Sequence, residues 1–268
     1  MTNLAPLPPS VLPSGIRSRF VESINGLRMH ILEAGFEAGS QRHAARPLVL
    51  LLHGFPDLAY CWRKVMLPLA AAGFHVVALD GPGFGDSPLL PPESYHPDAL
   101  AELAHRLVAT LDLEPLVFMG HSWGGAVAVR YAAAHPTLVR AIVLLDSGHI
   151  DYRDLPDVDA DRPPEDWVAE AAARDPRLAE ARGRAMHGLT ERISDGWAVL
   201  AEHGIPTLLL LATVDPHGTQ NREHVGAFER ALPQAEVRWV EGAGHGLLDD
   251  VGPPLGDEIA AWLQRRAA

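Results

Sequence analysis

The sequence lacks several features that would define a protein's class. Only one of its 268 residues is a cysteine, Cys61, so an intrachain disulfide and a cysteine-rich zinc site are both excluded. Basic residues are also scarce, with 22 Lys and Arg against 34 Asp and Glu, which gives a formal charge of -12. Nucleic-acid binding and docking on anionic membranes both need clustered Lys and Arg, so neither is expected. A small neutral or cationic substrate is consistent with this charge, and the sequence does not predict an oligomeric state.

Apolar runs long enough to cross a membrane are missing too, because no window approaches ~18 uninterrupted apolar residues. Residues 1–15 are rich in proline and lack the basic and apolar regions of a signal peptide, so we interpret them as an extended arm. No two histidines have the helical spacing, with a Glu between them, of a metal-binding motif. We therefore expect a cytoplasmic protein that uses no metal and no cofactor.

The sequence does contain a series of short apolar runs, each followed by a polar residue or a glycine. Continuous runs of this kind are typical of parallel strands that helices cover on both faces. They lie at residues 48–52, 75–79, 116–119, 141–145, 207–211 and 237–240. Apolar residues at helical spacing lie at residues 60–72, 98–111, 122–134, 221–232 and 254–266. Asn25-Gly26, ahead of them, predicts an antiparallel hairpin, so the whole pattern predicts an α/β fold with a mostly parallel sheet flanked by helices.

One segment interrupts this alternation. Residues 147–204 contain no strand-like run and are richer in Asp, Arg, Ala and Pro. Short helices are predicted there, at residues 165–173, 177–186 and 191–202. We interpret 147–204 as a helical cap over the carboxyl edge of the sheet, and residues 1–146 together with 205–268 as the core.

A glycine-rich turn, Gly120-His121-Ser122-Trp123-Gly124-Gly125, joins a predicted buried strand directly to a predicted helix. This is the G-x-S-x-G pattern in the strand–turn–helix context that it requires. A sharp turn lifts the serine hydroxyl above the sheet edge, and glycines avoid collisions in the strained backbone. The first amides of the helix, that of Trp123 in particular, can stabilise an oxyanion. Ser122 is therefore the predicted nucleophile.

With this turn the chain resembles the α/β-hydrolase fold superfamily over nearly its whole length, residues 16–266. It is similar to the branch that holds small esterases, lactonases, cofactor-free haloperoxidases and epoxide hydrolases. The matching motifs are His53-Gly54-Phe55-Pro56-Asp57, the sequence DGPGFGDS at residues 80–87, the turn around Ser122, and Gly242-Ala243-Gly244-His245. The resemblance implies eight strands, a cap after the sixth strand, and a triad in the chain order Ser, Asp, His. It also implies that the backbone N–H of Phe55 is the second oxyanion donor.

Two further residues complete the predicted triad. His245 lies between glycines just after the last predicted strand, and a neutral imidazole with a pKa near ~6.5 can accept the serine proton and return it. Asp215 follows the strand at 207–211, where a carboxylate can hold the tautomer of the histidine and stabilise the imidazolium. Asp146, at the end of the preceding strand, is the alternative, because some relatives place the acid there. Chain order favours Asp215.

The residue at the nucleophile position decides which reaction is expected. The epoxide hydrolases and dehalogenases with a similar 53–57 loop attack with an aspartate, whereas this chain has Ser122. A serine alkoxide suits acyl transfer through a tetrahedral oxyanion and an acyl-enzyme. We therefore predict a serine hydrolase acting on a carboxylic ester or lactone of a small or medium acyl group. Alternatives on the same triad are a proline-iminopeptidase-like amidase, a carbon–carbon bond hydrolase and a perhydrolase, and a ligand receptor with an idle triad is the non-enzymatic alternative.

Four residues are candidates for contact with the small-molecule substrate. Phe55 and Trp123 are expected to form apolar walls beside the nucleophile. His149 and Tyr152 stand where the chain enters the cap, at the expected mouth of the site.

Three other features are expected to be structural. The Asp-Gly-Pro-Gly-Phe-Gly segment at residues 80–85 resembles a dinucleotide fingerprint, but prolines follow where the fingerprint requires a helix, so we interpret it as a turn. His53 is expected to form structural hydrogen bonds. Trp167 and Trp197 are expected to pack inside the cap.

Overall fold

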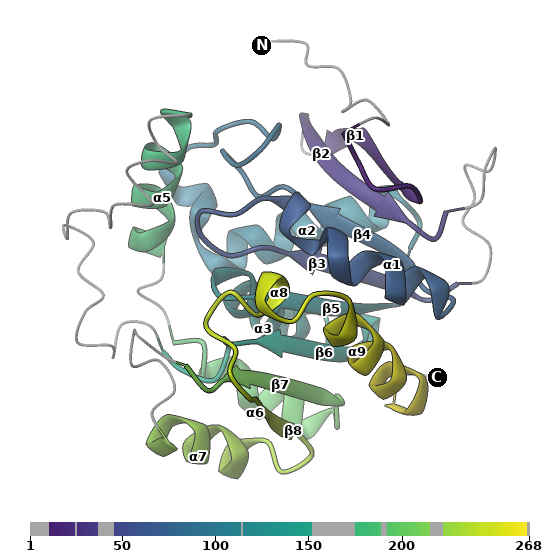
Figure 1. Cartoon of the computed structure of the whole chain (residues 1–268). Helices are drawn as coiled ribbons and strands as arrows, with labels where there is room; N and C mark the ends of the chain where they lie inside the picture. The colour runs from purple at the N-terminus through teal and green to yellow at the C-terminus, as the bar shows by residue number, and fades with distance from the viewer. Residues whose placement is uncertain are drawn as a thin grey trace.

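The computed structural model describes residues 11–24, 26–36, 46–113, 115–151, 175–188, 192–214 and 222–266. Within these ranges the chain forms one eight-stranded sheet with the strand order β1-β2-β4-β3-β5-β6-β7-β8 (Figure 1). The strands are β1 (Ile16–Ile24), β2 (Leu27–Ala34), β3 (Leu48–Leu52), β4 (His75–Leu79), β5 (Leu116–His121), β6 (Val139–Leu145), β7 (Thr207–Ala212) and β8 (Glu236–Val240). All six apolar runs are strands, and the predicted α/β class is confirmed.

The sheet is antiparallel only at its beginning. β1 and β2 form the predicted hairpin, in which Ile24 pairs with Leu27. β2 is also antiparallel to β4, and the remaining neighbours, from β4 across to β8, are parallel. The carboxyl ends of β3, β5, β6 and β7 consequently lie at one edge of the sheet, where chemistry-bearing residues from distant parts of the sequence meet.

Helices occupy the segments between the strands. They are α1 (Arg63–Ala71), α2 (Pro97–Thr110), α3 (Trp123–Ala134), α5 (Arg177–Gly188), α6 (Asp195–Glu202), α7 (Arg222–Ala231), α8 (Leu247–Asp250) and α9 (Pro253–Arg266), with 3-10 turns η1 (Ala59–Trp62), η2 (Pro92–Tyr95) and η3 (Pro136–Leu138). The five helices predicted for the core agree with α1, α2, α3, α7 and α9 to within a few residues. No α-helix begins between residues 80 and 91, as expected of the structural turn.

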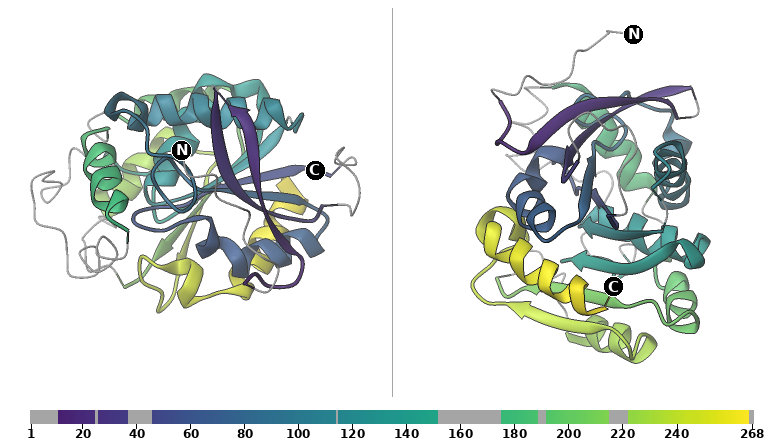
Figure 2. Two further views of the ribbon diagram at one scale, coloured as in Figure 1. Left: turned by 90° about the horizontal axis from the view of Figure 1, so that it is seen from above. Right: turned by 90° about the vertical axis from the view of Figure 1, so that its right-hand side faces the viewer.

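The side chains of the central strands alternate between two apolar layers. In β3, Leu48, Leu50 and Leu52 pack in the layer that contains α2, α3, α6 and α7, whereas Val49 and Leu51 pack in the layer that contains α1, α8 and α9. Figure 2 shows helices on both sides of the twisted sheet. All five β3 residues are buried, which is why this strand is apolar throughout instead of alternating.

The predicted cap at residues 147–204 is described at 147–151, 175–188 and 192–204. α5 and α6 agree with two of its predicted helices, and the third, at 165–173, lies outside the described residues, as does Trp167. Arg177 donates a hydrogen bond to the carbonyl oxygen of Gly85 at 2.8 Å, so α5 rests against the 80–87 loop. The division into core and cap stays a prediction.

Trp197 of α6 is buried, but it packs against α7 of the predicted core and not inside the cap alone. Its side chain is buried, its ring meets that of Phe228 edge-on at 5.3 Å between centroids, and Nε1–H donates to the carbonyl oxygen of Gly148 at 2.9 Å. This tryptophan therefore joins the start of the cap segment to the core.

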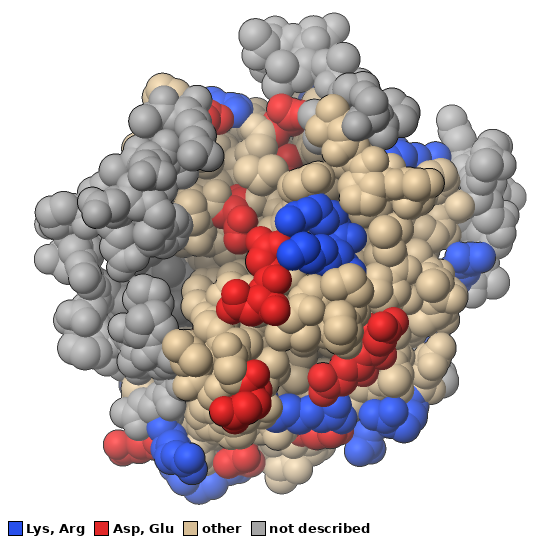
Figure 3. Space-filling view, in the orientation of Figure 1, with Lys and Arg blue, Asp and Glu red and all other residues tan. Residues whose placement is uncertain are grey.

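The surface carries charges of both signs. On the face that Figure 3 presents, Lys and Arg side chains lie in small groups beside Asp and Glu. Oδ1 of Asp249, for example, is 2.8 Å from Lys64 Nζ and 3.1 Å from Arg63 Nη2. Across the described ranges, none of the helices is both long and apolar enough to cross a membrane.

Candidate active site

Ser122 lies at the sharp turn between β5 and α3, at the carboxyl edge of the sheet. Its φ of 51° and ψ of -124° are uncommon for a residue that has a side chain. The glycines of this turn leave no room for a side chain. A Cβ on Gly120 would lie 2.2 Å from the carbonyl oxygen of Gly124, and one on Gly124 would lie 2.1 Å from that of Leu52. The glycines are therefore what allows the chain to turn so sharply at Ser122.

Two backbone N–H groups near Ser122 are the predicted oxyanion donors. Trp123 is the first residue of α3, so its N–H has no acceptor one turn earlier in the helix. The loop that carries Phe55 lies against the turn, because a Cβ on Gly54 would be only 2.6 Å from the Cβ of Ser122. Both N–H groups thus belong to segments that adjoin Ser122, and their catalytic role stays a prediction.

A histidine–aspartate pair lies at the same edge of the sheet. Nδ1 of His245 is 2.6 Å from Oδ2 of Asp146, and the Asp146 side chain is fully buried whereas that of His245 is 31% exposed. Because a carboxylate only accepts hydrogen bonds, Nδ1 of the neutral ring carries the proton and Nε2 keeps a lone pair. The other carboxylate oxygen, Oδ1, accepts a hydrogen bond from the backbone N–H of Ala212 at 3.2 Å. The pair can therefore hold His245 in the tautomer that a general base requires.

The carboxylate on His245 is that of Asp146, which the sequence suggested as the alternative to Asp215. Asp215 lies outside the described residues, so the role expected of it stays a prediction. β6 and β7 are parallel neighbours in which Leu145 pairs with Leu210, so an aspartate after either strand starts from the same edge of the sheet. Chain order alone therefore cannot separate the two candidates.

The loop that carries His245 is tied to the nucleophile turn through His121. Nε2 of His121 donates a hydrogen bond to the carbonyl oxygen of His245 at 2.7 Å, and the two ring centroids are 4.8 Å apart. Burial, reinforced by the neighbouring His245 imidazole, lowers the pKa of His121 to about 3, so this ring is neutral at physiological pH. Ser122 and His245 therefore come from segments that touch. In the sequence, the one signal of a role for His121 is its position next to Ser122.

His53 holds the peptide that carries the predicted Phe55 donor. Nδ1 of His53 donates to the carbonyl oxygen of Gly54 at 2.7 Å, and Nε2 accepts from the backbone N–H of Gly81 at 2.9 Å. Both ring nitrogens are thus used in one neutral tautomer, and burial lowers the pKa of this imidazole. The Gly54 carbonyl and the Phe55 N–H point in opposite directions from one planar peptide unit. By fixing the carbonyl, His53 fixes the direction of the N–H, which is the structural role expected of it.

Three aromatic rings, which we call the aromatic wall, pack on one another around Trp123, the residue after Ser122. The rings of Phe55 and Trp123 are stacked, with centroids 4.7 Å apart and an interplanar angle of 21°. Phe84, which is fully buried, lies 5.5 Å from Phe55 and 5.9 Å from Trp123 between ring centroids. Phe84, from the 80–87 loop, thus adds a third ring to the predicted pair of Phe55 and Trp123.

A second chain of Ser, His and Asp side chains lies in the hairpin half of the sheet. Ser18 Oγ is 2.8 Å from Nε2 of His30, whose Nδ1 is 2.6 Å from Oδ2 of Asp80. Asp80 Oδ1 also accepts the backbone N–H of Ala59 at 2.6 Å, just after the Phe55 loop. Ser18 lies within the β1 ladder and not at a strand–helix turn, so no helix N-terminus faces its hydroxyl. This chain joins β1, β2 and β4 to the loop and has a structural role.

His149 and Tyr152 are the two remaining candidates for contact with substrate. His149 is fully buried, and Tyr152 lies outside the described residues, so their contact with substrate stays a prediction.

Asp57, two residues after Phe55, is a titratable group near the site to which the sequence assigned no role of its own. Burial raises the pKa of the Asp57 carboxyl, and it lies within electrostatic range of His53 and His245.

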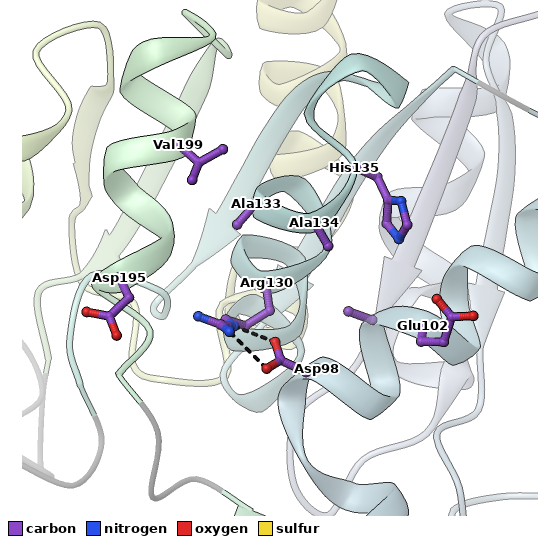
Figure 4. A pocket seen from close by; sticks show the side chains of 9 residues that line it. Asp98, Glu102, Arg130, Ala133, Ala134, His135, Asp195 and Val199 are labelled. Atoms are coloured by element: carbon purple, nitrogen blue, oxygen red, sulfur yellow. Dashed lines mark hydrogen bonds and ion pairs between the residues drawn. The ribbon is translucent and has the colours of Figure 1, made fainter.

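Other features of the described chain lie apart from Ser122. Over the part of the chain that the structure describes, no three His, Cys, Asp or Glu side chains are grouped so as to hold a metal ion. A hollow of about 400 Å³ lies between α2, α3 and α6, and none of the predicted site residues lines it (Figure 4). Across it, Arg130 Nε and Nη2 donate to the two carboxylate oxygens of Asp98 at 2.5 and 2.8 Å.

Comparison with known proteins agrees with this fold. A family model described as alpha/beta hydrolase fold matches residues 47–192, more than half of the chain. The bifunctional epoxide hydrolase 2 of Rattus norvegicus is 35% identical over 144 residues, which cover 53% of this chain and 24% of that protein. Epoxide hydrolase A of Mycobacterium tuberculosis is 37% identical over 141 residues, 52% of this chain and 41% of that protein. An AB hydrolase superfamily protein of Bacillus subtilis is 35% identical over 138 residues, 50% of this chain and 45% of that protein, so each match spans less than half of the relative.

Solved structures share the fold over nearly the whole chain. An epoxide hydrolase from Vigna radiata superposes with a TM-score of 0.70 at 21% identity, covering 94% of this chain and 98% of that one. The thioesterase domain from the curacin biosynthetic pathway superposes with a TM-score of 0.66 at 21% identity, covering 93% and 99%. At such identities the likeness shows the fold alone. Together with the family model, it establishes that this chain belongs to the alpha/beta hydrolase fold family.

Proposed function

We propose that this α/β hydrolase is a serine hydrolase that cleaves a carboxylic ester or lactone through an acyl-enzyme. Ser122 is the nucleophile, His245 the general base, and Asp146 the acid that orients it. The observation that carries the proposal is the 2.6 Å contact between His245 Nδ1 and Asp146 Oδ2, on a loop that His121 ties to the serine turn. A partly exposed imidazole bonded to a fully buried carboxylate supports the role of general base that we propose for His245.

In the proposed reaction, Nε2 of His245 takes the proton of the Ser122 hydroxyl while Oγ attacks the acyl carbon. The carbonyl electrons move onto oxygen, and the backbone N–H groups of Phe55 and Trp123 bind the resulting oxyanion. The imidazolium, stabilised by Asp146, gives its proton to the leaving alkoxide as the C–O bond breaks. Water then attacks the acyl-enzyme with help from the same base, which releases the acid and restores the serine.

The aromatic wall supports an apolar acyl group. Phe55, which is partly exposed, stacks on the buried ring of Trp123 and packs against buried Phe84, and such rings favour apolar or aromatic groups over charged ones. We propose small or medium acyl chains as the substrate class, with Phe55 and Trp123 in contact with them. His149 and Tyr152 remain the proposed contacts at the mouth.

Hydrolysis of p-nitrophenyl acetate and butyrate tests the proposal. The Ser122→Ala variant should lose about 10⁴-fold or more in kcat while its circular dichroism spectrum matches that of the wild type. Ser94→Ala, in η2 and away from the turn, is the matched control and should keep wild-type turnover. Unchanged turnover in Ser122→Ala, or no turnover of any ester by the wild type, would rule the proposal out.

Epoxide hydrolysis is the second candidate, and the names of the relatives favour it. Epoxide hydrolases appear both among the sequence relatives and among the structures of the same fold. A serine at the nucleophile position argues against it, because the resemblance implies an aspartate for that reaction. Styrene oxide therefore separates the two: turnover of the epoxide that exceeds turnover of esters favours the second candidate.

Three further activities and one non-enzymatic function share the same residues. Amide cleavage, carbon–carbon bond cleavage and perhydrolysis all use a serine, a histidine and an oxyanion site. An aminoacyl amide, a diketone substrate and hydrogen peroxide as acyl acceptor would reveal them in turn. A receptor with an idle triad predicts tight binding of a small molecule without labelling of Ser122 by a fluorophosphonate.

A further inference from the structure

Ser147, the residue after Asp146, contacts the backbone of the proposed nucleophile. Its side chain is fully buried, and its Oγ donates a hydrogen bond to the carbonyl oxygen of Ser122. The same carbonyl oxygen accepts the backbone N–H of Gly125 at 2.9 Å. Two donors from different segments therefore hold the peptide group that follows the Ser122 side chain.

The conformation of Ser122 gives this contact its importance. A residue with a side chain at a φ of 51° persists only where its surroundings hold it there. The direction of the Ser122 hydroxyl depends on these backbone angles. A group that fixes the Ser122 carbonyl therefore also helps to fix where Oγ points.

Packing leaves the Ser147 hydroxyl little freedom. A Cβ on Gly125 would lie 2.5 Å from Ser147 Oγ and 2.7 Å from its Cβ, so the first turn of α3 fits against this side chain only because position 125 is a glycine. Side chain and helix are thus in direct contact at the base of the nucleophile turn.

Asp146 and Ser147 act on different partners because the chain turns between them. Asp146 has a φ of 49°, and its N–H donates to the carbonyl oxygen of Leu210 at 2.8 Å. Its side chain reaches His245, whereas that of the next residue reaches Ser122. Two consecutive residues at the end of β6 thereby contact both partners of the proposed proton transfer.

We propose that Ser147 is a positioning residue that holds the Ser122 backbone in its reactive conformation. Its effect on turnover rests on the proposed function, whereas its effect on the turn does not. The Asp146-Ser147 pair at the end of β6 then sets the relative placement of base and nucleophile, and a change at either residue should disturb one partner and leave the other in place.

The test compares Ser147→Ala with the wild type in two measurements. With p-nitrophenyl butyrate, kcat should fall about tenfold or more while KM stays within about twofold, because a misplaced nucleophile weakens the transition state and not substrate binding. The pH midpoint of kcat/KM should not move, since Ser147 Oγ bonds the serine backbone. Hydrogen exchange of the peptide that covers residues 120–128 should become faster.

A matched pair protects the test against poor folding of the alanine variant. Ser147→Thr and Ser147→Val have the same shape and differ only in the hydroxyl, so Thr should retain more turnover and slower exchange than Val. Wild-type kcat in Ser147→Ala, or equal behaviour of the Thr and Val variants, overturns the inference. Should the wild type hydrolyse no ester, the proposed function fails, and exchange alone decides: faster exchange without the hydroxyl supports the contact and unchanged exchange overturns it.

Discussion

The carbonyl oxygen of His245 accepts a hydrogen bond from Nε2 of His121 at 2.7 Å, and His121 directly precedes Ser122. The proposed base is therefore held at two points, its ring by Asp146 and its main chain by the nucleophile turn itself. Here the hydrogen bond from the buried His121 ring limits the distance between the two segments.

The identity of the acid is the first prediction. Asp146→Asn should lower kcat by about 10⁴-fold, because an amide cannot hold the same tautomer or stabilise the imidazolium. Asp215→Asn, its counterpart after the neighbouring strand, should lower kcat by less than about tenfold. Steady-state kinetics on p-nitrophenyl butyrate measures both. The opposite ranking would return the role to Asp215.

A second prediction concerns the pH dependence of stability at His121. Its pKa is about 3 in the folded protein, against an ordinary value of 6.5. Between these values the unfolded chain binds a proton that the folded chain does not, so stability is fully present above pH 6.5 and declines as the pH falls toward 3. By pH 4.5 this group alone should cost about 2 to 3 kcal/mol.

His121→Gln isolates that contribution. Glutamine can donate to the His245 carbonyl but does not titrate, so the loss of unfolding free energy between pH 7 and pH 4.5 should be smaller than in the wild type. Urea unfolding at the two pH values measures it. Equal losses in both proteins would mean that His121 is protonated in the folded state.

A third prediction concerns His53 and the oxyanion loop. His53→Ala removes the donor to the Gly54 carbonyl, so the N–H of Phe55 loses its fixed direction. We expect kcat to fall about 10- to 100-fold with little change in KM, since the oxyanion forms only in the transition state. His203→Ala, at an exposed histidine directly after α6, is the control and should leave both constants unchanged. A rise in KM at constant kcat would contradict the role assigned to His53.

The fourth prediction concerns the contribution of Glu33, in the β1–β2 hairpin, to the stability of the fold. Glu33 is fully buried and accepts hydrogen bonds from Arg17, Arg19 and His75 at 2.7 to 2.8 Å. Burial alone would raise the pKa of this carboxyl, but the three donors lower it well below its usual range. Glu33→Gln leaves two guanidinium groups without their counter-charge and should lower the free energy of unfolding by about 3 to 5 kcal/mol.

An exposed pair in the same hairpin serves as the control for Glu33. Glu22 pairs with Arg28 at 2.8 Å, and its side chain is 65% exposed. Glu22→Gln should change the free energy of unfolding by less than about 1 kcal/mol, because water screens a surface pair. Urea unfolding compares the two variants, and similar effects would contradict the account of Glu33.

Most of the fold could be predicted because its strands are buried on both faces. The run at residues 48–52 is apolar at every position, so its periodicity does not distinguish a buried strand from a buried helix. Its short length and the His-Gly that follows it indicate a strand. Ser122 and His245 were recognisable because Ser122 directly follows a strand, His245 lies a few residues after one, and both have a glycine-rich setting. Both signals lie in short stretches of sequence, so they can be recognised without knowledge of long-range contacts.

The contacts between segments could not be predicted in the same way. Asp146 and Asp215 follow neighbouring parallel strands, and which carboxylate meets His245 depends on the path of the loop and not on either local sequence. The bonds of His121 and Ser147 depend on backbone angles at Ser122 and Asp146 that lie at positive φ. Residues with such angles look ordinary in a sequence, so the groups that hold them are found only in three dimensions.

Covalent labelling of Ser122 tests the central claim most directly. The wild type is incubated with a fluorophosphonate and digested, and the modified residue is located by mass spectrometry. The account predicts one adduct, on Ser122, that is lost in His245→Ala and unaffected by Ser18→Ala, which removes the serine of the second Ser–His–Asp chain. An adduct on another residue, or labelling of Ser122 at the same rate without His245, would contradict it.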